Sequence, residues 1–394
     1  MRILFLSRWY PYPIDNGAKI RIFYLLKYLA KEHDVDLLAF SDEPVDARRR
    51  EALLAHCQEV RVFPYKKFEP TTLKALTGYF SKVPRAYLDT YSPQVDVAVR
   101  HLAQKHPYDV VVASQIDMAL YGLLVPDAVK IFEEIEITTI YDRYSKQTGK
   151  LARFRAGLTW RKLSHFIDYL LGQYQASTVV SENEAELVRS VLTKDHPIAV
   201  IPNGFEVDKH IGQSVTKEPF SMIYSGALSY SANFDAVAYF LAEIFPLIRR
   251  EYPQAKLYVT GKLDGVPVEQ LPQQDGVEFT GYVEDIQSKV AESMVCVVPL
   301  RVGGGTRLKV LEALALETPI VSTTKGVEGL EASDGKEVLI SDDPQGFAHA
   351  VGRLFDDREL YEKLARNGRS LVEAHYNWEY IGEQLNNFIG EVAK

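Results

Sequence analysis

Residues 294–324 read MVCVVPLRVGGGTRLKVLEALALETPIVSTT, and their pattern is the most informative in the chain. A short apolar run ends at Pro299, glycines occupy positions 303–305, a helical pattern runs from 306 to 317, and a second apolar run begins at Pro319. A strand, a glycine loop, a helix and a strand in this order can bind phosphate, because glycine lets the backbone approach a ligand and the helix start favours an anion. We therefore expect an α/β fold with an anion site at this loop.

The helical part of this stretch carries charged candidates for the site. Thr306 is the expected N-cap, and Arg307 and Lys309 place positive charge where a diphosphate would need it. Glu312 lies about 60° from Lys309 around the helix, and a carboxylate can accept hydrogen bonds from two hydroxyl groups at once. The alternative is an i,i+3 ion pair on the protein surface. The functional interpretation makes Arg307, Lys309 and Glu312 the catalytic candidates.

Composition restricts the classes of protein that fit. With 394 residues, 46% of them hydrophobic and 25% charged, the chain is long enough for two globular domains. The net charge of -8 argues against a general nucleic-acid binder. Cys57 and Cys296 stand far apart without metal-ligand spacing, so we expect neither a disulfide framework nor a zinc site. The N-terminal apolar run is too short for a signal peptide, and we expect no window near the about 20 apolar residues of a spanning helix.

Strand patterns alternate with helical patterns throughout, which predicts parallel sheets covered by helices on both faces. Strands are expected at 2–7, 35–40, 60–63, 109–113, 129–133, 177–181, 198–201, 220–225, 255–260, 277–280, 294–298, 319–322 and 337–340. A polar stretch without periodicity, around 204–219, is the expected linker. We expect two Rossmann-like, doubly wound domains that face each other across a cleft. The first spans 1–205 together with a C-terminal helix, 376–394, that crosses back, and the second spans 206–375.

Several motifs in a fixed order resemble the retaining glycosyltransferases of family 4, which have the two-domain GT-B fold. They are Asp15-Asn16-Gly17, VIPNGFEVD (200–208), YSGALSYSANFDAVAYF (224–240), FTGYVED (279–285) and PLRVGGGTRLKVLEALALETPIVST (299–323). The resemblance covers most of the chain, and the opening is similar to bacterial members associated with exopolysaccharide systems. It implies an acceptor-binding first domain, a donor-binding second domain, and transfer of a sugar from a nucleoside-diphosphate sugar, of UDP or GDP type, to a glycan or lipid-linked acceptor. It implies no metal and no further cofactor.

The resemblance also assigns residues to the donor. Glu312 matches the glutamate that holds the ribose hydroxyls, and Tyr282 and Val283 match the place where the nucleobase stacks. The alternative for these two is an ordinary strand-to-helix loop with Gly281 in the turn and Asp285 near the helix start. The remaining donor-binding candidates are Gly17, Gly226, Gly303, Gly304, Gly305, Thr306, Arg307 and Lys309.

Three positions depart from the family pattern. Gly304 stands where typical members carry the first glutamate of an E-x7-E motif, which reaches the donor sugar. Ala227 and Ala232 stand where many members carry an Arg and a Lys that neutralise the diphosphate. We therefore expect the backbone of 303–306 to contact the sugar, and Arg307 and Lys309 to supply the missing positive charge.

Neither a catalytic base nor a metal site is evident. Where some relatives place a histidine in the first domain, this chain has Ser114, Gln115 and Asp117. A front-side displacement, in which the leaving phosphate takes the acceptor proton, needs no protein base. Asp34 and Asp36 form a D-x-D, which binds a metal in the other large glycosyltransferase fold, but the apolar alternation beyond them predicts a solvated strand edge. We assign no metal.

A basic, apolar segment is the candidate for acceptor or membrane contact. Residues 143–167 contain no acidic residue, and 71–88 have a similar mixture of basic and aromatic residues. Basic residues interleaved with Trp, Phe and Leu suit an anionic membrane surface, and the alternative is a helix with a solvated basic face and a core-facing apolar face. We expect a cytoplasmic protein, peripheral at the inner face of the plasma membrane if this segment binds lipid. The candidates are Arg153, Arg155, Trp160, Arg161 and Lys162.

Two other functions stay open at this point. A catalytically silent sugar-nucleotide or glycan-binding subunit is favoured by the missing glutamate and the missing basic pair. A nucleotide-sugar epimerase of similar architecture would need acid and base side chains clustered at the cleft. It is the weaker alternative, because four histidines of the first half lie in no recognisable strand-end motif: His101, His106, His165 and His196.

Overall fold

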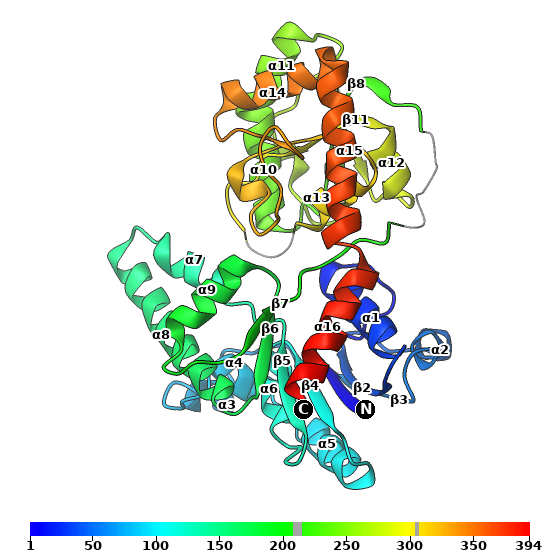
Figure 1. Ribbon diagram of the computed structural model, residues 1–394. Helices are drawn as coiled ribbons and strands as arrows, with labels where there is room; N and C mark the ends of the chain where they lie inside the picture. The colour runs from blue at the N-terminus through cyan, green and yellow to red at the C-terminus, as the bar shows by residue number, and fades with distance from the viewer. Residues whose placement is uncertain (208–214, 304–306) are drawn as a thin grey trace. The chain divides into compact units, whose positions relative to one another are not determined.

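The computed structural model describes residues 1–207, 215–303 and 307–394, which fall into two compact units (Figure 1). Unit 1 comprises Met1–Pro202 and Ile381–Lys394, and unit 2 comprises Asn203–Tyr380. The domain boundaries expected from the sequence, after residues 205 and 375, lie a few residues away from these. Each unit has its own sheet and its own buried apolar core.

Unit 1 contains a seven-stranded parallel sheet in the order β3-β2-β1-β4-β5-β6-β7. Its central strands are buried on both faces, as parallel strands covered by helices must be. The strands are β1 (Arg2–Ser7), β2 (Asp34–Ser41), β3 (Glu59–Pro64), β4 (Val110–Ser114), β5 (Val129–Glu133), β6 (Ala176–Val179) and β7 (Ile198–Val200). The helices are α1 (Gly17–Leu29), α2 (Ala47–Leu54), α3 (Leu73–Thr77), α4 (Arg85–Thr90), α5 (Pro93–Lys105), α6 (Ile116–Gly122), α7 (Thr138–Ser145), α8 (Lys150–Leu171) and α9 (Glu182–Val191).

Unit 2 contains a six-stranded parallel sheet in the order β10-β9-β8-β11-β12-β13. The strands are β8 (Glu218–Ser225), β9 (Lys256–Thr260), β10 (Val277–Gly281), β11 (Ser293–Val298), β12 (Ile320–Ser322) and β13 (Leu339–Ile340). The helical segments are α10 (Ser231–Tyr239), η2 (Phe240–Ile244), α11 (Phe245–Glu251), η3 (Val268–Gln270), α12 (Ile286–Glu292), α13 (Leu308–Ala315), η4 (Thr324–Gly326), α14 (Pro344–Asp356) and α15 (Arg358–His375). The last helix, α16 (Trp378–Val392), begins in unit 2 and continues into unit 1.

These two parallel α/β sheets confirm the predicted fold class, and each of the thirteen expected strand positions carries a strand. The helix expected over 306–317 is shorter, because it begins at Leu308 and ends at Ala315. Arg307 occupies its N-cap position and makes no side-chain cap. Thr306, the cap expected from the sequence, lies outside the described residues, as do Gly304 and Gly305.

The D-x-D at the start of β2 is not a solvated strand edge as expected. Asp34 is exposed, but Asp36 is only 1% exposed. The Asp36 carboxylate forms an ion pair with Arg2 at 2.8 Å and accepts a hydrogen bond from the Tyr108 hydroxyl at 2.8 Å. A buried carboxylate is tolerated when a cation and a hydrogen-bond donor compensate for its lost hydration, so Asp36 has a structural role here.

One helical stretch contradicts the expectation that no window resembles a membrane span. Ser231–Glu251, which joins α10, η2 and α11, has the length and the mean hydropathy, 1.2, of such a helix. This resemblance is one of length and composition only, and 44% of the window is buried within the protein. Its apolar residues, such as Val237, Phe240 and Phe245, belong to the core of unit 2.

Candidate functional site

The strand order of unit 2 reverses between β8 and β11, since the chain proceeds from β8 to β9 on one side and from β11 to β12 on the other. Open α/β sheets bind ligands outside the carboxyl ends of the strands at such a point. Gly226 follows β8 directly, the loop at Gly303 follows β11, and α13 begins just beyond that loop. Residues 294–324 therefore lead to this edge of the sheet.

Glycines with positive φ stand at four carboxyl ends of this sheet: Gly226 (153°), Gly261 (130°), Gly281 (69°) and Gly303 (104°). A Cβ at Gly226 would lie 2.7 Å from Lys309 Nζ, and a Cβ at Gly261 would lie 2.5 Å from the Gly226 carbonyl oxygen. Only glycine combines this backbone conformation with so close an approach. These glycines add no side chain of their own at the edge, which favours close contact of the backbone with a phosphate or a sugar.

Lys309 reaches from the first turn of α13 toward β8. Its Nζ donates a hydrogen bond to Asn233 Oδ1 at 3.1 Å and lies 3.9 Å from the centre of the Tyr224 ring. The Tyr224 hydroxyl donates to the same Asn233 oxygen at 2.7 Å, and Asn233 Nδ2 donates to the Ala227 carbonyl oxygen at 2.9 Å. Burial lowers the pKa of Lys309 to about 7. An anion placed beside this ammonium would favour its charged form.

Glu312 lies almost one turn beyond Lys309 and is partly buried. Burial raises the pKa of its carboxyl to about 7, although nearby Lys309 lowers it. Among the described residues the two side chains form no ion pair with each other, so the alternative of a surface i,i+3 pair is wrong. Glu312 also accepts no hydrogen bond from the described residues, which leaves both of its oxygens for hydroxyl groups of a ligand.

Arg307 is engaged with the loop itself. Its buried guanidinium donates from Nη2 to the carbonyl oxygens of Gly303 at 2.9 Å and Lys325 at 3.1 Å, and lies 3.6 Å from the Glu328 carboxylate. These contacts hold the start of the glycine loop against η4. A direct role of Arg307 at a diphosphate stays a prediction.

The nucleobase candidates lie at the carboxyl end of β10. The Tyr282 side chain is 70% exposed, so its ring is free to stack, and Val283 is partly buried. Gly281 makes the turn, and Asp285 caps α12 by accepting a hydrogen bond from the Ser288 N–H at 3.0 Å. This geometry fits both the nucleobase interpretation and the ordinary-loop interpretation, so the assignment of Tyr282 and Val283 stays a prediction.

Unit 1 has a comparable edge, because its strand order reverses between β1 and β4. Gly17 begins α1 there, with Asn16 as its cap. Arg21, one turn further along α1, is fully buried and lies 2.7 Å from the carboxylate of Glu133 at the end of β5. The Ser114 hydroxyl, at the end of β4, donates to the same carboxylate at 2.6 Å.

The next residues after these two strands, Gln115 and Glu134, meet above the sheet. Gln115 Nε2 donates to Glu134 Oε2 at 2.9 Å. Burial, and next the charge of Glu133, raise the pKa of Glu134 to about 8. Ionisable side chains with a perturbed pKa therefore gather at this edge of unit 1, which makes it a candidate ligand site.

Sequence reasoning missed several of these residues. Gly261 and Glu134 each come directly after an expected strand, and that position was a usable signal at the edge where ligands bind. Asn233, Tyr224 and Arg21 gave no local signal, because their importance comes from contacts with side chains distant in the sequence.

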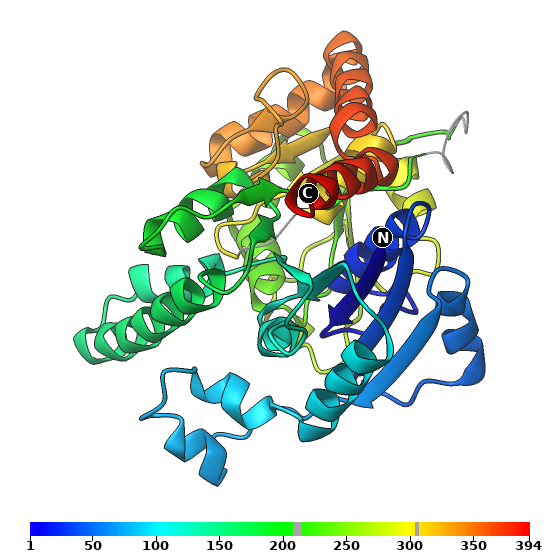
Figure 2. The ribbon, with the colours of Figure 1, turned by 60° about the horizontal axis from the view of Figure 1, so that its bottom comes forward.

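The two basic segments of the first half lie side by side in unit 1 (Figures 1 and 2). Lys162 of α8 donates from Nζ to the carbonyl oxygen of Gly78 after α3, and the Tyr87 ring of α4 stacks on Phe166 of α8 with centroids 5.9 Å apart. Trp160 is partly buried and packs on Tyr141 at a centroid distance of 5.0 Å. Lys162 and Trp160 therefore help to join the segments, whereas Arg153, Arg155 and Arg161 are exposed.

Large apolar side chains beside these arginines face solvent. The exposed fractions are 96% for Phe80, 78% for Leu73, 69% for Leu151 and 64% for Phe154. The alternative of a core-facing apolar face holds only for the second half of α8, where Leu163, Phe166, Ile167, Leu170 and Leu171 are buried. We call the exposed surface of residues 73–80 and 150–161 the basic-apolar patch.

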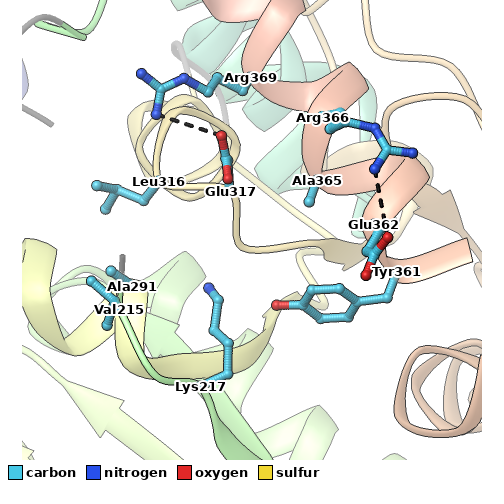
Figure 3. Close-up of a pocket in the computed structure, with 10 residues that line it drawn as sticks. All are labelled: Val215, Lys217, Ala291, Leu316, Glu317, Tyr361, Glu362, Ala365, Arg366 and Arg369. Atoms are coloured by element: carbon cyan, nitrogen blue, oxygen red, sulfur yellow. Dashed lines mark ion pairs between the residues drawn. The ribbon is translucent and has the colours of Figure 1, made fainter. Parts of the chain in front are cut away.

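Unit 2 also contains a hollow of about 290 Å³ at the start of β8 and the end of α13 (Figure 3). It lies at the opposite ends of these elements from the Gly226 and Gly303 loops. Figure 3 shows Lys217 and Tyr361 pointing toward each other across it, and Lys217 Nζ donates to Thr318 Oγ1 at 2.8 Å. Arg369 pairs with Glu317 at 3.7 Å, and Arg366 with Glu362 at 3.6 Å. Because its charges are largely paired, we place the donor at the carboxyl edge instead.

Comparisons with known proteins identify the family of the chain. A model described as Glycosyltransferase Family 4 matches residues 15–209, and one described as Glycosyl transferases group 1 matches 219–357. The Staphylococcus aureus capsular polysaccharide biosynthesis glycosyltransferase CapM is 23% identical over 59% of this chain and 68% of its own.

Two solved structures share the whole fold. Sucrose-phosphate synthase from Thermosynechococcus elongatus superposes with a TM-score of 0.72 at 18% identity, over 100% of this chain and 99% of its own. Anabaena Alr3699/HepE in complex with UDP and glucose superposes with a TM-score of 0.67 at 15% identity, over 99% of this chain and 100% of its own. One glycosyltransferase family model matches each half of the chain, and together the two models cover most of it. The protein therefore belongs to the family-4-like glycosyltransferases of the GT-B fold.

Proposed function

We propose that the protein is a retaining, metal-independent glycosyltransferase that moves a sugar from a nucleoside-diphosphate sugar to a hydroxyl of a glycan or lipid-linked acceptor. One observation carries the proposal. At the switch point of unit 2, α13 presents a lysine whose pKa is lowered by burial and a carboxyl group that accepts no hydrogen bond from the described residues. A diphosphate at Lys309 and the ribose hydroxyls at Glu312 would satisfy both groups at once.

The comparisons support the donor class and the pathway. The solved structure of Anabaena Alr3699/HepE, a protein of the same fold, is a complex with UDP and glucose. The name of CapM refers to capsular polysaccharide biosynthesis. We therefore infer a UDP or GDP sugar as the donor and a polysaccharide or its lipid-linked precursor as the product.

The chemistry follows from where charge develops. In a front-side displacement the acceptor oxygen attacks the anomeric carbon on the face that the diphosphate leaves. The bond from carbon to the phosphate oxygen breaks, its electron pair stays on that oxygen, and the oxygen takes the acceptor proton. Protonated Lys309 and the N-terminal end of α13 would stabilise the negative charge that grows on the leaving group. The positive charges absent at Ala227 and Ala232 would then not be required.

The same absence favours a second candidate, a catalytically silent binding subunit. It would bind the sugar nucleotide at the same edge without cleaving it. Slow release of nucleoside diphosphate from a bound sugar nucleotide would favour the enzyme, and tight binding without release would favour the binding subunit.

A thermal-shift screen against UDP-, GDP-, ADP- and dTDP-sugars tests the proposal, because a ligand that binds only the folded protein raises its unfolding temperature. We expect one nucleotide class to raise that temperature and its sugar nucleotide to be hydrolysed slowly. The absence of a shift with all four classes would contradict the proposal.

We also propose that the basic-apolar patch attaches the protein to the cytoplasmic face of an anionic membrane, where a lipid-linked acceptor would be found. Exposed Phe and Leu side chains can enter the headgroup region while neighbouring arginines pair with lipid phosphates.

A further inference from the structure

At the carboxyl edge of unit 1, two neighbouring residues hold backbone conformations that are rare for their types. The φ angle is 68° at Gln115 and 57° at Glu134, and both residues directly follow a strand. Hydrogen bonds fix these positions, because the Gln115 N–H donates to the Glu133 carbonyl oxygen at 2.9 Å and the Glu134 N–H donates to Thr178 Oγ1 at 3.1 Å. Strained non-glycine residues that the surrounding structure holds in place cluster at functional sites.

The carboxyl group of Glu134 differs from that of its neighbour Glu133. Arg21 and Ser114 compensate for the buried charge of the Glu133 carboxylate. Among the described residues, the carboxyl group of Glu134 accepts one side-chain hydrogen bond, from Gln115. The Oε1 atom of Gln115 is buried without a partner there. A buried amide oxygen without a protein partner is costly unless a water or a ligand bonds to it.

The charges around Glu134 favour its neutral form. Glu133 of β5 and Glu136, which precedes α7, oppose its ionisation, and Arg21 of α1 favours it but is already paired with Glu133. Burial is the largest effect. Burial and the two acidic neighbours outweigh Arg21 and the hydrogen bond from Gln115, and they raise the pKa of Glu134 to about 8. Near neutral pH this side chain is therefore mainly a carboxylic acid, which can both donate and accept a hydrogen bond.

We propose that Glu134 binds the acceptor sugar, with its carboxyl group hydrogen-bonded to an acceptor oxygen and held in place by Gln115. The inference rests on the proposed glycosyl transfer. The position fits, because β4 lies at the switch point of the sheet and β5 lies beside it. A neutral group also suits a front-side transfer, in which the acceptor proton goes to the leaving phosphate. The acidic neighbours Glu133 and Glu136 favour an uncharged, hydroxyl-rich sugar over an anionic one.

Kinetics with UDP-glucose as donor and n-octyl glucoside as acceptor test this assignment. Gln is close in shape to a protonated Glu, so Glu134→Gln should keep the acceptor KM within roughly threefold of wild type near neutral pH, whereas Glu134→Ala should raise it roughly tenfold. Between about pH 7 and about pH 9 the wild-type acceptor KM should rise as Glu134 ionises, and the KM of Glu134→Gln should not.

The matched control is Glu186→Gln, because Glu186 is an exposed acid of the same unit, on α9, away from this group of side chains. It should leave the acceptor KM near neutral pH unchanged. Binding of UDP-glucose, measured by thermal shift, should be the same in every variant.

Two outcomes would overturn the assignment. The first is an acceptor KM of Glu134→Gln as high as that of Glu134→Ala, because an ionised carboxylate would then be required. The second is a Glu134→Ala variant with the wild-type acceptor KM. If wild-type protein binds UDP-glucose but neither transfers to nor binds the glucoside, the acceptor assignment fails alone. If it does not bind UDP-glucose either, the result counts against the proposed transfer as well.

Discussion

At the scale of single residues, Lys309 decides how donor binding depends on pH. Its pKa of about 7 in the free protein means that the amine is mostly neutral at about pH 8. A bound diphosphate favours the charged form, so binding at that pH should take up a proton. Above neutral pH, the affinity for the donor should consequently fall as pH rises, until Lys309 no longer protonates in the complex.

Titration calorimetry with UDP-glucose in buffers of different ionisation enthalpy measures this proton uptake. We expect Lys309→Met to abolish it and to weaken binding roughly tenfold or more, the usual effect of losing a charge-assisted hydrogen bond. Lys289→Met is the matched control, because Lys289 also lies over a tyrosine ring, that of Tyr258 at 3.4 Å, but on α12. Unchanged binding and proton uptake in Lys309→Met would exclude Lys309 from the donor site.

At the scale of elements, the basic-apolar patch joins a short helix and the first half of a long one. Leu151 and Phe154 lie on the exposed half of α8, and Phe80 follows α3. We expect wild-type protein to float with anionic liposomes at low salt, and a Phe80→Ser, Leu151→Ser, Phe154→Ser variant to lose most of this binding, because each buried apolar side chain adds to interfacial affinity.

Val97→Ser is the control for this flotation assay, since Val97 is also exposed, at 68%, but lies on α5 outside the patch. High salt should weaken binding of the wild type because it screens the arginines. Failure of wild-type protein to float at low salt would refute membrane attachment.

The elements also show how far the sequence determines the fold. Buried parallel strands are short apolar runs, so they were predictable, and α15 and α16 have the periodicity of amphipathic helices. The ends of helices and the burial of polar side chains were less predictable. Helix α13 begins at Leu308 because Arg307 turns to bind carbonyl oxygens of the neighbouring loops. Asp36 is buried because Arg2 and Tyr108 reach it. Both results depend on contacts between distant segments, which local patterns do not contain.

The same distinction applies to the candidate sites. Lys309 and Glu312 could be found because helical spacing relates them to a glycine loop. The link from Lys309 to Asn233 and Tyr224, and the ion pair of Arg21 with Glu133, form only when the sheet brings separate strand ends together. The strained backbone of Glu134 has no sequence signature at all, since glutamate rarely adopts a positive φ.

At the scale of the whole molecule, the C-terminal helix connects the two units. Trp378 belongs to unit 2, whereas residues 381–394 belong to unit 1, where Asn386 Nδ2 donates to the Tyr28 carbonyl oxygen at 3.4 Å. Gly382 lies directly against α1, because a Cβ there would come 2.4 Å from the Cβ of Tyr28. The stability of unit 1 therefore depends on a segment that follows the whole of unit 2 in the chain.

Gly382→Ala tests this dependence. The added methyl group must push α16 away from α1, and we expect a loss of about 1–3 kcal/mol in unit 1, the usual cost of overpacking. Gly390→Ala in the same helix meets nothing within 4 Å, so it should stabilise the helix by up to about 1 kcal/mol through its higher helix propensity. Hydrogen exchange should then speed up in α1 and β1 of Gly382→Ala and stay unchanged in the core of unit 2. Equal exchange in the two variants would mean that α16 does not support unit 1, and faster exchange in both units of Gly382→Ala would mean that they unfold as one cooperative body.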